Sequence, residues 1–342
     1  MYKFLKIFFL FFAIQLVQSI HAQDLHFSQY FNAPLLVNPA NTGFNPDFDY
    51  RVGGNYRNQW SSVTAYPYKT MNIWGDAQLF TERFENAWVG VGAAMLQDVA
   101  GSGSLTSTQA YASVAYHQLL GYSSLLSAGF NIGFTQKRID LSKLTFNSQW
   151  NGKFFDINIP SGEPFSYNAV KYLSLQVGVN YSWFVNDNLY LSSGISVSNI
   201  NRPNESFFSN TKVDTKIKPR YTFFANGSLK VNDVWILNPN FYYSITGSAK
   251  EIVFGGLLQR DLSAEGNGSL QLLAGAYYRV SDAMIPMIGF DIKNLKITFN
   301  YDVTSSSLKS YNNSIGAYEV SIVKNGLYKG KEKSIKCPGV RF

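Results

Sequence analysis

Runs of about ten residues in which apolar and polar side chains alternate recur along most of this sequence. In LSLQVGVNYS, residues 173–182, every odd position is apolar and every even position is glycine or polar. The same alternation is found at 126–135 and 295–302. Successive side chains of a β-strand point to opposite faces, so each run predicts a strand with one apolar and one polar face. About ten residues is also the length of a tilted strand that crosses a membrane.

About fourteen such strands can be traced. They lie near 49–57, 68–79, 86–97, 104–118, 123–137, 170–184, 188–199, 219–231, 234–245, 250–260, 269–280, 284–293, 295–302 and 313–323. If the N-terminus is periplasmic, the longest gaps (58–67, 138–169, 200–218 and 303–312) all fall at one end. VNDN at 185–188 and the Lys293–Asn294 pair predict tight turns at the other end. The predicted fold is therefore all-β, a transmembrane antiparallel β-barrel of outer-membrane type over residues 49–323.

A soluble β-sandwich is the alternative, because its strands also alternate. The polar face here is rich in Gly, Ser, Asn and Gln, which is typical of a barrel lumen, and the runs exceed the five or six residues usual in sandwiches. Tyr and Trp near strand ends, such as Trp60, Tyr68 and Trp183, fit the aromatic girdles of a membrane barrel. The neutral, glycine-rich inner face favours a plugged or tightly packed interior over an open ion-selective pore.

The N-terminus carries a predicted export signal. Lys3 and Lys6 accompany the apolar run FLKIFFLFFAI, and SIHA precedes Gln23, so residues 1–22 are interpreted as a signal peptide cleaved after about Ala22. An N-terminal anchor helix is the alternative, but the run is shorter than the roughly 20 residues that span a bilayer. We therefore expect an exported protein of the outer membrane, in contact with outer-membrane lipid.

Residues 23–48 are not expected to form a barrel strand. Pro34, Pro39 and Pro46 lack the N–H donor that a strand ladder needs. The segment is predicted to be a plug or a periplasmic lid whose aromatic side chains insert into the barrel mouth. These side chains are Phe27, Tyr30 and Phe31. A disordered linker is the alternative.

Catalytic and cofactor motifs are sparse. Of the three histidines, His21 falls in the predicted signal peptide, and His26 and His117 have no His or Cys partner at metal-ligand spacing. The phosphate-binding patterns GxxxxGKS and GxGxxG do not occur. The single cysteine, Cys337, allows no intrachain disulfide. We expect no enzyme, no cofactor and no metal; a Ser-His-Asp hydrolase that uses His117 is the alternative.

The formal net charge of +7 is concentrated in the C-terminal tail, residues 324–342. Its basic residues include Lys329, Lys331, Lys333 and Lys336. The excess does not form a basic patch with stacking aromatics, so no nucleic-acid partner is expected. A periplasmic tail of this charge would meet anionic headgroups or an acidic partner, and a solvated end is the alternative.

The longest predicted outer loop, residues 138–169, is unusually aromatic. Its candidate partner-binding residues are Phe146, Trp150, Phe154, Phe155, Phe165 and Tyr167. A solvated loop should not expose so much apolar surface, so the loop either constricts the lumen or docks an exported protein. Lys153, Asp156 and Glu163 interrupt the aromatics and would be costly to bury in a packed lumen, which favours docking.

Several segments, taken in order, resemble the PorP/SprF family of Bacteroidetes. They are HFSQYFNAPLLVNPANTGF, YRNQW followed by YPYKT, GVGAAMLQDVAGSG, GVNYSWFVNDNLYLSSGISVSNINRP, YDVTSS, AYEVSI and the terminal CPGVRF. The family's Met-Phe-Asn-Pro element is FNAP here, residues 31–34, and its Asn-Pro-Ala-Tyr element is NPAN, residues 38–41. The chain also inserts Gly339 and Val340 into the Cys-Pro-Arg-Phe ending. The resemblance extends over nearly the whole chain that follows the predicted signal.

The resemblance implies a non-catalytic outer-membrane barrel that serves the type IX secretion system. Family members act as accessories in the export or surface attachment of large secreted adhesins, in some cases linked to gliding motility. The implied partners are a secreted adhesin or other type IX secretion components. Periodicity alone leaves open an outer-membrane channel or transporter for small or hydrophobic solutes.

Overall fold

The computed structural model describes residues 27–45, 47–84, 86–163, 165, 167–208 and 214–328. The predicted signal peptide, residues 1–22, lies outside the described residues. So does the basic part of the tail, with Lys329, Lys331, Lys333, Lys336 and Cys337. Within the described residues no helix has the length and apolar character needed to span a membrane.

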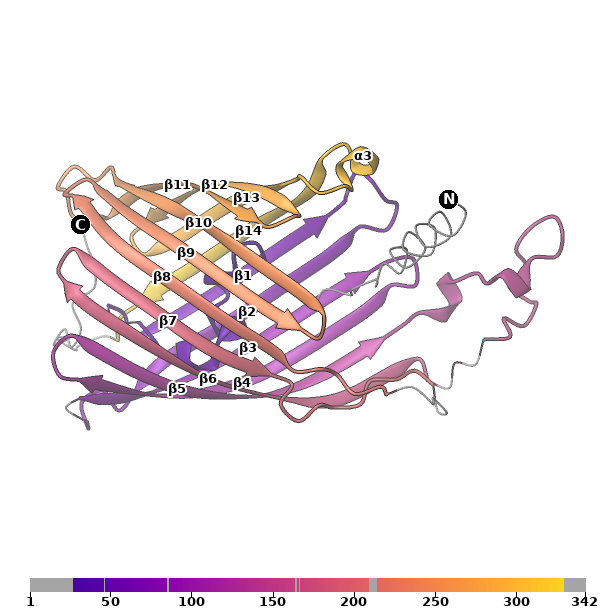
Figure 1. The fold of residues 1–342 in the computed structure, drawn as a ribbon, viewed down its shortest axis with the longest axis horizontal. Coiled ribbons are helices and arrows are strands. Elements are labelled where there is room, and N and C mark those ends of the chain that lie inside the picture. Colours follow the sequence, from indigo (N-terminus) through magenta and orange to yellow (C-terminus); the bar gives the residue numbers. More distant parts are fainter. Residues whose placement is uncertain are drawn as a thin grey trace, which may run out of the picture.

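The described chain closes into a barrel of fourteen antiparallel strands, in which each strand pairs with its sequence neighbours and β1 pairs with β14 (Figure 1). The strands are β1 Tyr50–Gln59, β2 Tyr68–Leu79, β3 Ala87–Ala100, β4 Leu105–Leu120, β5 Ser124–Arg138, β6 Ala169–Asn186, β7 Leu189–Ser198, β8 Arg220–Asn232, β9 Trp235–Thr246, β10 Ala249–Asp261, β11 Leu270–Arg279, β12 Ala283–Ile292, β13 Leu295–Thr304 and β14 Ile315–Gly326. The predicted all-β transmembrane barrel is confirmed.

The two ends of the barrel differ in the length of their connections. One end, called here the long-loop end, carries the connections 60–67, 101–104, 139–168, 199–219, 247–248, 280–282 and 305–314, with the short helix α3 (Lys309–Asn312) in the last. The opposite, short-turn end includes Lys293 and Asn294, whose φ angles of 49° and 67° suit a two-residue hairpin that follows the strand twist. In outer-membrane barrels the longer loops face the exterior.

Apolar side chains cover the outer surface of the wall and polar side chains line the inside. Along β6, Val177, Val179 and Tyr181 are 38%, 43% and 44% exposed. Gln176 and Asn180, which lie between them in the sequence, are buried. The predicted assignment of the two faces is confirmed, and an exposed apolar band of this extent is stable in contact with lipid.

The last strand continues beyond the predicted barrel end at residue 323, because β14 reaches Gly326. The alternation did not predict this continuation, because Lys324 places a charge on the face where apolar, lipid-facing side chains are expected. Its Nζ donates to the carbonyl oxygen of Lys293 at 2.7 Å, at the short-turn rim. A long cationic side chain can thus reach polar groups at the rim while its stem lies along apolar surface.

Depth in the membrane can be tested on β6. Val177 pairs with Phe130 halfway along the neighbouring strand β5, so we place both near the bilayer midplane. Val177→Arg should lower the free energy of unfolding by about 2 to 4 kcal/mol, because the charge leaves water for hydrocarbon. Leu173→Arg, nearer the long-loop rim on the same face, should cost about 0 to 1 kcal/mol. Reversible denaturant unfolding in lipid vesicles measures both, and equal losses would contradict the placement.

Candidate functional site

The N-terminal segment, residues 27–45, lies in the lumen, where the indigo chain runs between the walls of the barrel (Figure 1). Its short elements are the 3₁₀ turn η1 (Tyr30–Asn32), the helical turn α2 (Pro34–Val37) and the 3₁₀ turn η2 (Pro39–Asn41). Pro34 and Pro39 each occupy a first helical position, where no N–H donor is required. The prolines that prevent a strand therefore fit the short turns of this lumenal segment.

Inward-pointing side chains of the wall bind the backbone of the lumenal segment. The bonds run from Trp74 Nε1 to Asn32 O at 2.9 Å, from Asn131 Nδ2 to Leu35 O at 3.1 Å, from Ser196 Oγ to Val37 O at 2.7 Å and from Trp88 Nε1 to Gly43 O at 3.0 Å. Conversely, Asn38 Nδ2 donates to the carbonyl oxygens of Val179 and Ile195 in the wall. Backbone groups of the lumenal segment, which in a strand would bond to a neighbouring strand, here bond to side chains of the inner wall.

Three inward-facing glycines provide the space for this segment. An added Cβ would lie 1.9 Å from Thr42 O at Gly90, 2.3 Å from Pro39 C at Gly129 and 2.1 Å from Asn38 Oδ1 at Gly178. None of these separations is sterically possible. At Gly90 and Gly129 the obstructing atoms are backbone, so a larger residue would force the wall and the segment apart. At Gly178 the Asn38 side chain would have to move and give up its bonds to the wall. The glycine-rich inner face is thus explained at these positions by close approach of the backbone.

His117 joins the wall to the segment. Its Nδ1 lies 2.7 Å from Ser127 Oγ and its Nε2 lies 2.8 Å from Thr42 O, while its ring stacks on Trp88 with 4.9 Å between centroids. His117 and Ser127 are 0% and 1% exposed. In a Ser-His-Asp triad the serine bonds Nε2 and a carboxylate bonds Nδ1, whereas here the serine is at Nδ1 and a backbone carbonyl is at Nε2. These contacts assign His117 a role in holding the segment.

A buried cluster of charges lies near the long-loop end, formed by Arg57 of β1, Arg279 of β11, Asp302 of β13 and Glu319 of β14. An Arg57 nitrogen lies 2.9 Å from Asp302 and the other 3.4 Å from Glu319, and Arg279 also contacts Asp302. Arg279 also pairs with Asp282, which is 35% exposed, at 2.6 Å. Each buried charge of the cluster therefore has a partner of opposite sign, and a buried charge without a partner is strongly destabilising.

The same cluster holds the start of the lumenal segment. The backbone N–H groups of Ser28 and Gln29 donate to the two carboxylate oxygens of Glu319 at 2.9 and 3.0 Å. Ser28 Oγ donates to both oxygens of Asp302 at 2.9 and 2.8 Å. Hydrogen bonds to an ionised carboxylate are stronger than neutral ones. The segment is therefore anchored at its beginning by charge and along its length by amides and hydroxyls.

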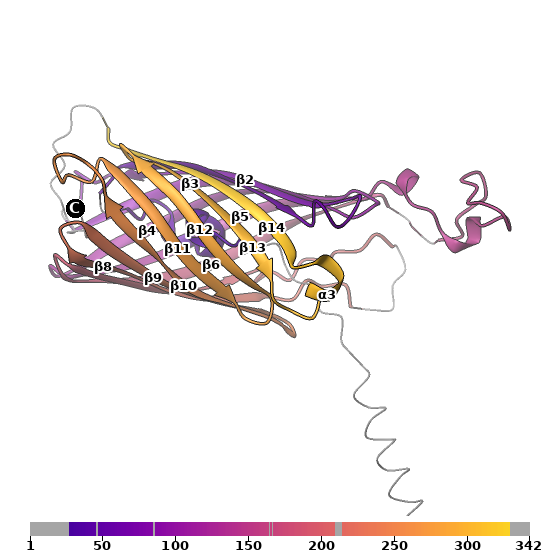
Figure 2. The same cartoon turned by 90° about the horizontal axis from the view of Figure 1, so that it is seen from above.

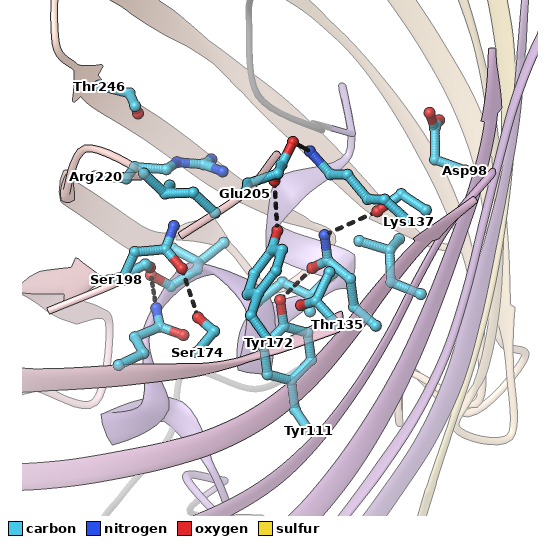
Figure 3. A pocket seen from close by; sticks show the side chains of 18 of the residues that line it. Asp98, Tyr111, Thr135, Lys137, Tyr172, Ser174, Ser198, Glu205, Arg220 and Thr246 are labelled. Atoms are coloured by element: carbon cyan, nitrogen blue, oxygen red, sulfur yellow. Dashed lines mark hydrogen bonds and ion pairs between the residues drawn. The ribbon is translucent and has the colours of Figure 1, made fainter. Parts of the chain in front are cut away.

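The lumenal segment separates two cavities. The larger, of about 480 Å³, lies at the long-loop end and is called here the outer vestibule; the smaller, of about 140 Å³, is lined by short-turn-end residues such as Arg51 and Tyr190. Tyr30 and Val37 line both cavities. Figure 3 shows side chains around the outer vestibule, including Glu205, which pairs with Lys137 at 2.7 Å and accepts a bond from the Tyr172 hydroxyl at 2.9 Å.

The three aromatic residues predicted for a plug all contact the barrel interior. Phe27 lines the outer vestibule and is 6% exposed, and Tyr30 packs on Tyr242 with 4.7 Å between ring centroids. Phe31 is half-buried and stacks on Tyr277 at 5.4 Å. The position of Phe27 among long-loop residues places the beginning of the segment toward that end, away from the short-turn end where a periplasmic lid would lie.

The aromatic loop between β5 and β6 projects beyond the barrel rim in both views (Figures 1 and 2). Four of its six predicted binding residues form the exposed aromatic group, Trp150, Phe154, Phe155 and Tyr167, with exposures of 49%, 59%, 45% and 56%. Trp150 and Phe155 meet edge to face at 5.1 Å. None of the four lines either of the two cavities.

The other two predicted partner-binding residues pack against other aromatic rings. Phe146 and Phe165 are half-buried with their ring centroids 6.1 Å apart, and Phe165 stacks on Phe208 of the next long loop at 5.1 Å. The backbone N–H of Tyr167 also donates to the carbonyl oxygen of Phe207 at 3.1 Å. Phe165 and the Tyr167 backbone therefore join the two long loops, and Phe146 packs behind Phe165 within its own loop.

Sequence reasoning missed the buried charge cluster. The alternation does place Asp302 and Glu319 on the inner face, and that signal was available. Their convergence with Arg57 depends on the pairing of β1 with β14, which is the closure of the barrel. As for metals, no three His, Cys, Asp or Glu side chains of the described ranges are grouped so that they could hold an ion.

Comparison with known proteins agrees with this architecture. A family model described as type IX secretion system membrane protein PorP/SprF matches residues 19–323. No curated protein matches the sequence. Among solved structures, the CymD monoaromatic hydrocarbon channel has a TM-score of 0.50 at 10% identity, covering 87% of this chain and 93% of that one.

A FadL homologue of Pseudomonas aeruginosa also has a TM-score of 0.50 at 10% identity, covering 84% of this chain and 92% of that one. At such low identity the likeness of these two structures shows the barrel fold alone. The family match, by contrast, extends over most of the chain. The protein belongs to the PorP/SprF family of type IX secretion system membrane proteins and is an outer-membrane β-barrel.

Proposed function

We propose that this barrel is a closed, non-catalytic platform of type IX secretion that aids the export or surface attachment of a large secreted adhesin. The observation that carries the proposal is the exposed aromatic group on the loop that projects beyond the rim. Exposed aromatic side chains on a protruding loop are costly in water and are typical anchors of protein interfaces. In a motile cell, an adhesin held in this way would serve gliding.

The filled lumen supports a platform in preference to a conduit. The lumenal segment crosses the interior and is bound by side chains from several strands, including Trp74, Asn131 and Ser196. The buried charge cluster anchors its start through Ser28 and Gln29. A solute would have to displace this whole set of contacts in order to pass.

The direction of the aromatic loop supports docking in preference to constriction. A constricting loop would place its aromatics among the residues that line the lumen, whereas the exposed aromatic group lines neither cavity. Lys153 and Asp156 accompany these aromatics on the same loop. An interface of apolar anchors with a polar rim is the usual composition of a specific protein contact.

The test removes the loop and asks whether the partner stays. Deletion of residues 147–162 should leave a heat-modifiable barrel in the outer membrane and abolish co-purification of the secreted adhesin, identified by quantitative mass spectrometry. A milder variant changes Trp150, Phe154 and Phe155 to serine. Loss of even one interface hot spot of about 2 kcal/mol weakens binding about 30-fold.

The matched control changes Tyr122, which is fully exposed in the turn at the opposite end, to serine. This control should retain the partner at the wild-type level. If the loop deletion also retains the partner and instead produces ion conductance in a planar bilayer, the loop is a constriction and the docking proposal is wrong.

A further inference from the structure

The inner wall of this barrel is a surface that binds polypeptide backbone. Asn131, Ser196 and Trp74 donate to carbonyl oxygens of the lumenal segment, and Glu319 accepts two of its N–H groups. These contacts use backbone atoms, which every peptide possesses, whatever its side chains. The chemistry that holds the segment is therefore not restricted to the segment's own sequence.

The same rows of inward-facing side chains continue past the segment into the outer vestibule. On β7, Ser196 binds Val37 O, and Ser198, the next inward-facing residue, lines the vestibule. On β6, Gln176 donates to Val37 O, and Ser174 and Tyr172 follow toward the long-loop end. Inward positions on one strand repeat every second residue, about 6.6 to 7 Å, which is also the repeat of an extended peptide.

The vestibule combines an apolar floor with charged groups. Tyr30 and Val37 of the lumenal segment line its floor and are 5% and 8% exposed. The ion pair of Lys137 with Glu205 at the wall adds both a cation and an anion, which suits the mixed polarity of a peptide.

We infer that the outer vestibule receives an extended peptide segment of the secreted protein that docks on the exposed aromatic group. This inference rests on the proposed function. It assigns to the lumen a second role, which is to bind a segment of the docked partner. The loop makes side-chain contact with the folded partner outside the barrel, and the vestibule binds the backbone of one of the partner's extended segments. The lumenal segment forms the floor and stays in place.

The experiment uses a photo-crosslinking amino acid, p-benzoylphenylalanine, introduced into the full-length protein in cells. One site is Tyr111 of β4, which lines the vestibule (Figure 3), and its matched control is Tyr116 of the same strand, which is 48% exposed on the lipid face. A third site, Phe154, reports the loop contact. Sequencing of the crosslinked peptides should show that Tyr111 and Phe154 capture the same secreted protein, at Tyr111 through one short stretch, and that Tyr116 captures no secreted protein.

The outcomes distinguish failure of the vestibule inference from failure of the docking proposal on which it rests. Capture at Phe154 without capture at Tyr111 overturns the vestibule inference and leaves the docking proposal standing. Failure at both positions overturns both. A carbohydrate or lipid adduct at Tyr111 overturns the assignment of a peptide as the ligand.

A second variant fills the cavity without touching the segment. Ser198→Trp should abolish capture at Tyr111 while the Phe154 crosslink persists, because the indole would occupy the path of the peptide. Ser198→Ala, which removes the hydroxyl but adds no volume, should retain capture at Tyr111. Undiminished capture in a heat-modifiable Ser198→Trp barrel would contradict the inference.

Discussion

Alanine at both Gly129 and Gly178 should drive the lumenal segment out of position while leaving the barrel closed. The two glycines face each other across β5 and β6, and an added Cβ would come within 2.3 Å of Pro39 and 2.1 Å of Asn38. Overpacking of this kind costs about 1 to 3 kcal/mol at each site. Both penalties fall on the same turn of the segment, so releasing that turn relieves them together.

Limited proteolysis of the folded, membrane-embedded protein measures the effect. Residues 27–45 should resist cleavage in the wild type and be cut rapidly in the double variant, with heat-modifiable mobility retained. The control is Gly75→Ala, where the nearest atom to an added Cβ is 3.5 Å away, an ordinary contact. If the double variant protects the segment as well as the wild type does, the segment does not depend on this close fit.

Loss of Arg57 from the buried charge cluster should strongly destabilise the barrel. Arg57→Met leaves Asp302 with Arg279 but removes the arginine that faces Glu319, whose carboxylate then has only hydrogen bonds from neutral groups such as the Ser28 and Gln29 N–H donors. Breaking a buried pair by removing one partner typically costs about 3 to 5 kcal/mol. Denaturant unfolding in vesicles should therefore show a large fall in the free energy of unfolding.

Two companion variants make this prediction specific. Glu319→Gln added to Arg57→Met removes the uncompensated charge and keeps an acceptor oxygen for the segment, so it should recover most of the loss. Lys137→Met breaks a pair whose side chains are 27% and 24% exposed, and it should cost about 0 to 1 kcal/mol. If the double variant is less stable than Arg57→Met alone, the explanation by an unpaired buried charge fails.

The barrel itself could be predicted from sequence because its signal is local and repeated. Every second residue of β6 faces lipid, so a run such as Leu173 to Tyr181 displays both faces within one strand. Loop lengths then alternate between the two ends without any knowledge of contacts. The end of β14 was harder, because Lys324 interrupts the apolar face at the rim where a charge is tolerated.

The interior could be predicted only in outline. Pro34 and Pro39 argue against a strand. The sequence of a segment without periodicity does not, however, indicate which residues of the wall it contacts. The need for glycine at Gly129 depends on Pro39, ninety residues earlier in the chain, approaching the wall closely. Arg57 and Glu319 meet only because the first and last strands pair. Such contacts between distant residues are set by the position of the lumenal segment inside the barrel and by closure of the barrel.

The aromatic loop between β5 and β6 could likewise be predicted only in part. Its aromatic content indicates that apolar surface must be covered, and Trp150 and Phe154 are exposed as a docking loop requires. Phe165 is instead covered by Phe208 from the next loop. No pattern within either loop indicates that these two rings stack, so composition identified the candidate residues without separating those that remain exposed from those that join the loops.

The most direct test of the closed platform is conductance across a planar lipid bilayer, with the purified wild-type barrel and the Gly129→Ala, Gly178→Ala double variant compared at equal insertion. We expect no steady conductance from the wild type, because the lumenal segment and its anchor fill the interior. The double variant should show stable openings once the segment is displaced. Steady, ohmic openings of the wild-type barrel would contradict the account and show that the protein is an open channel.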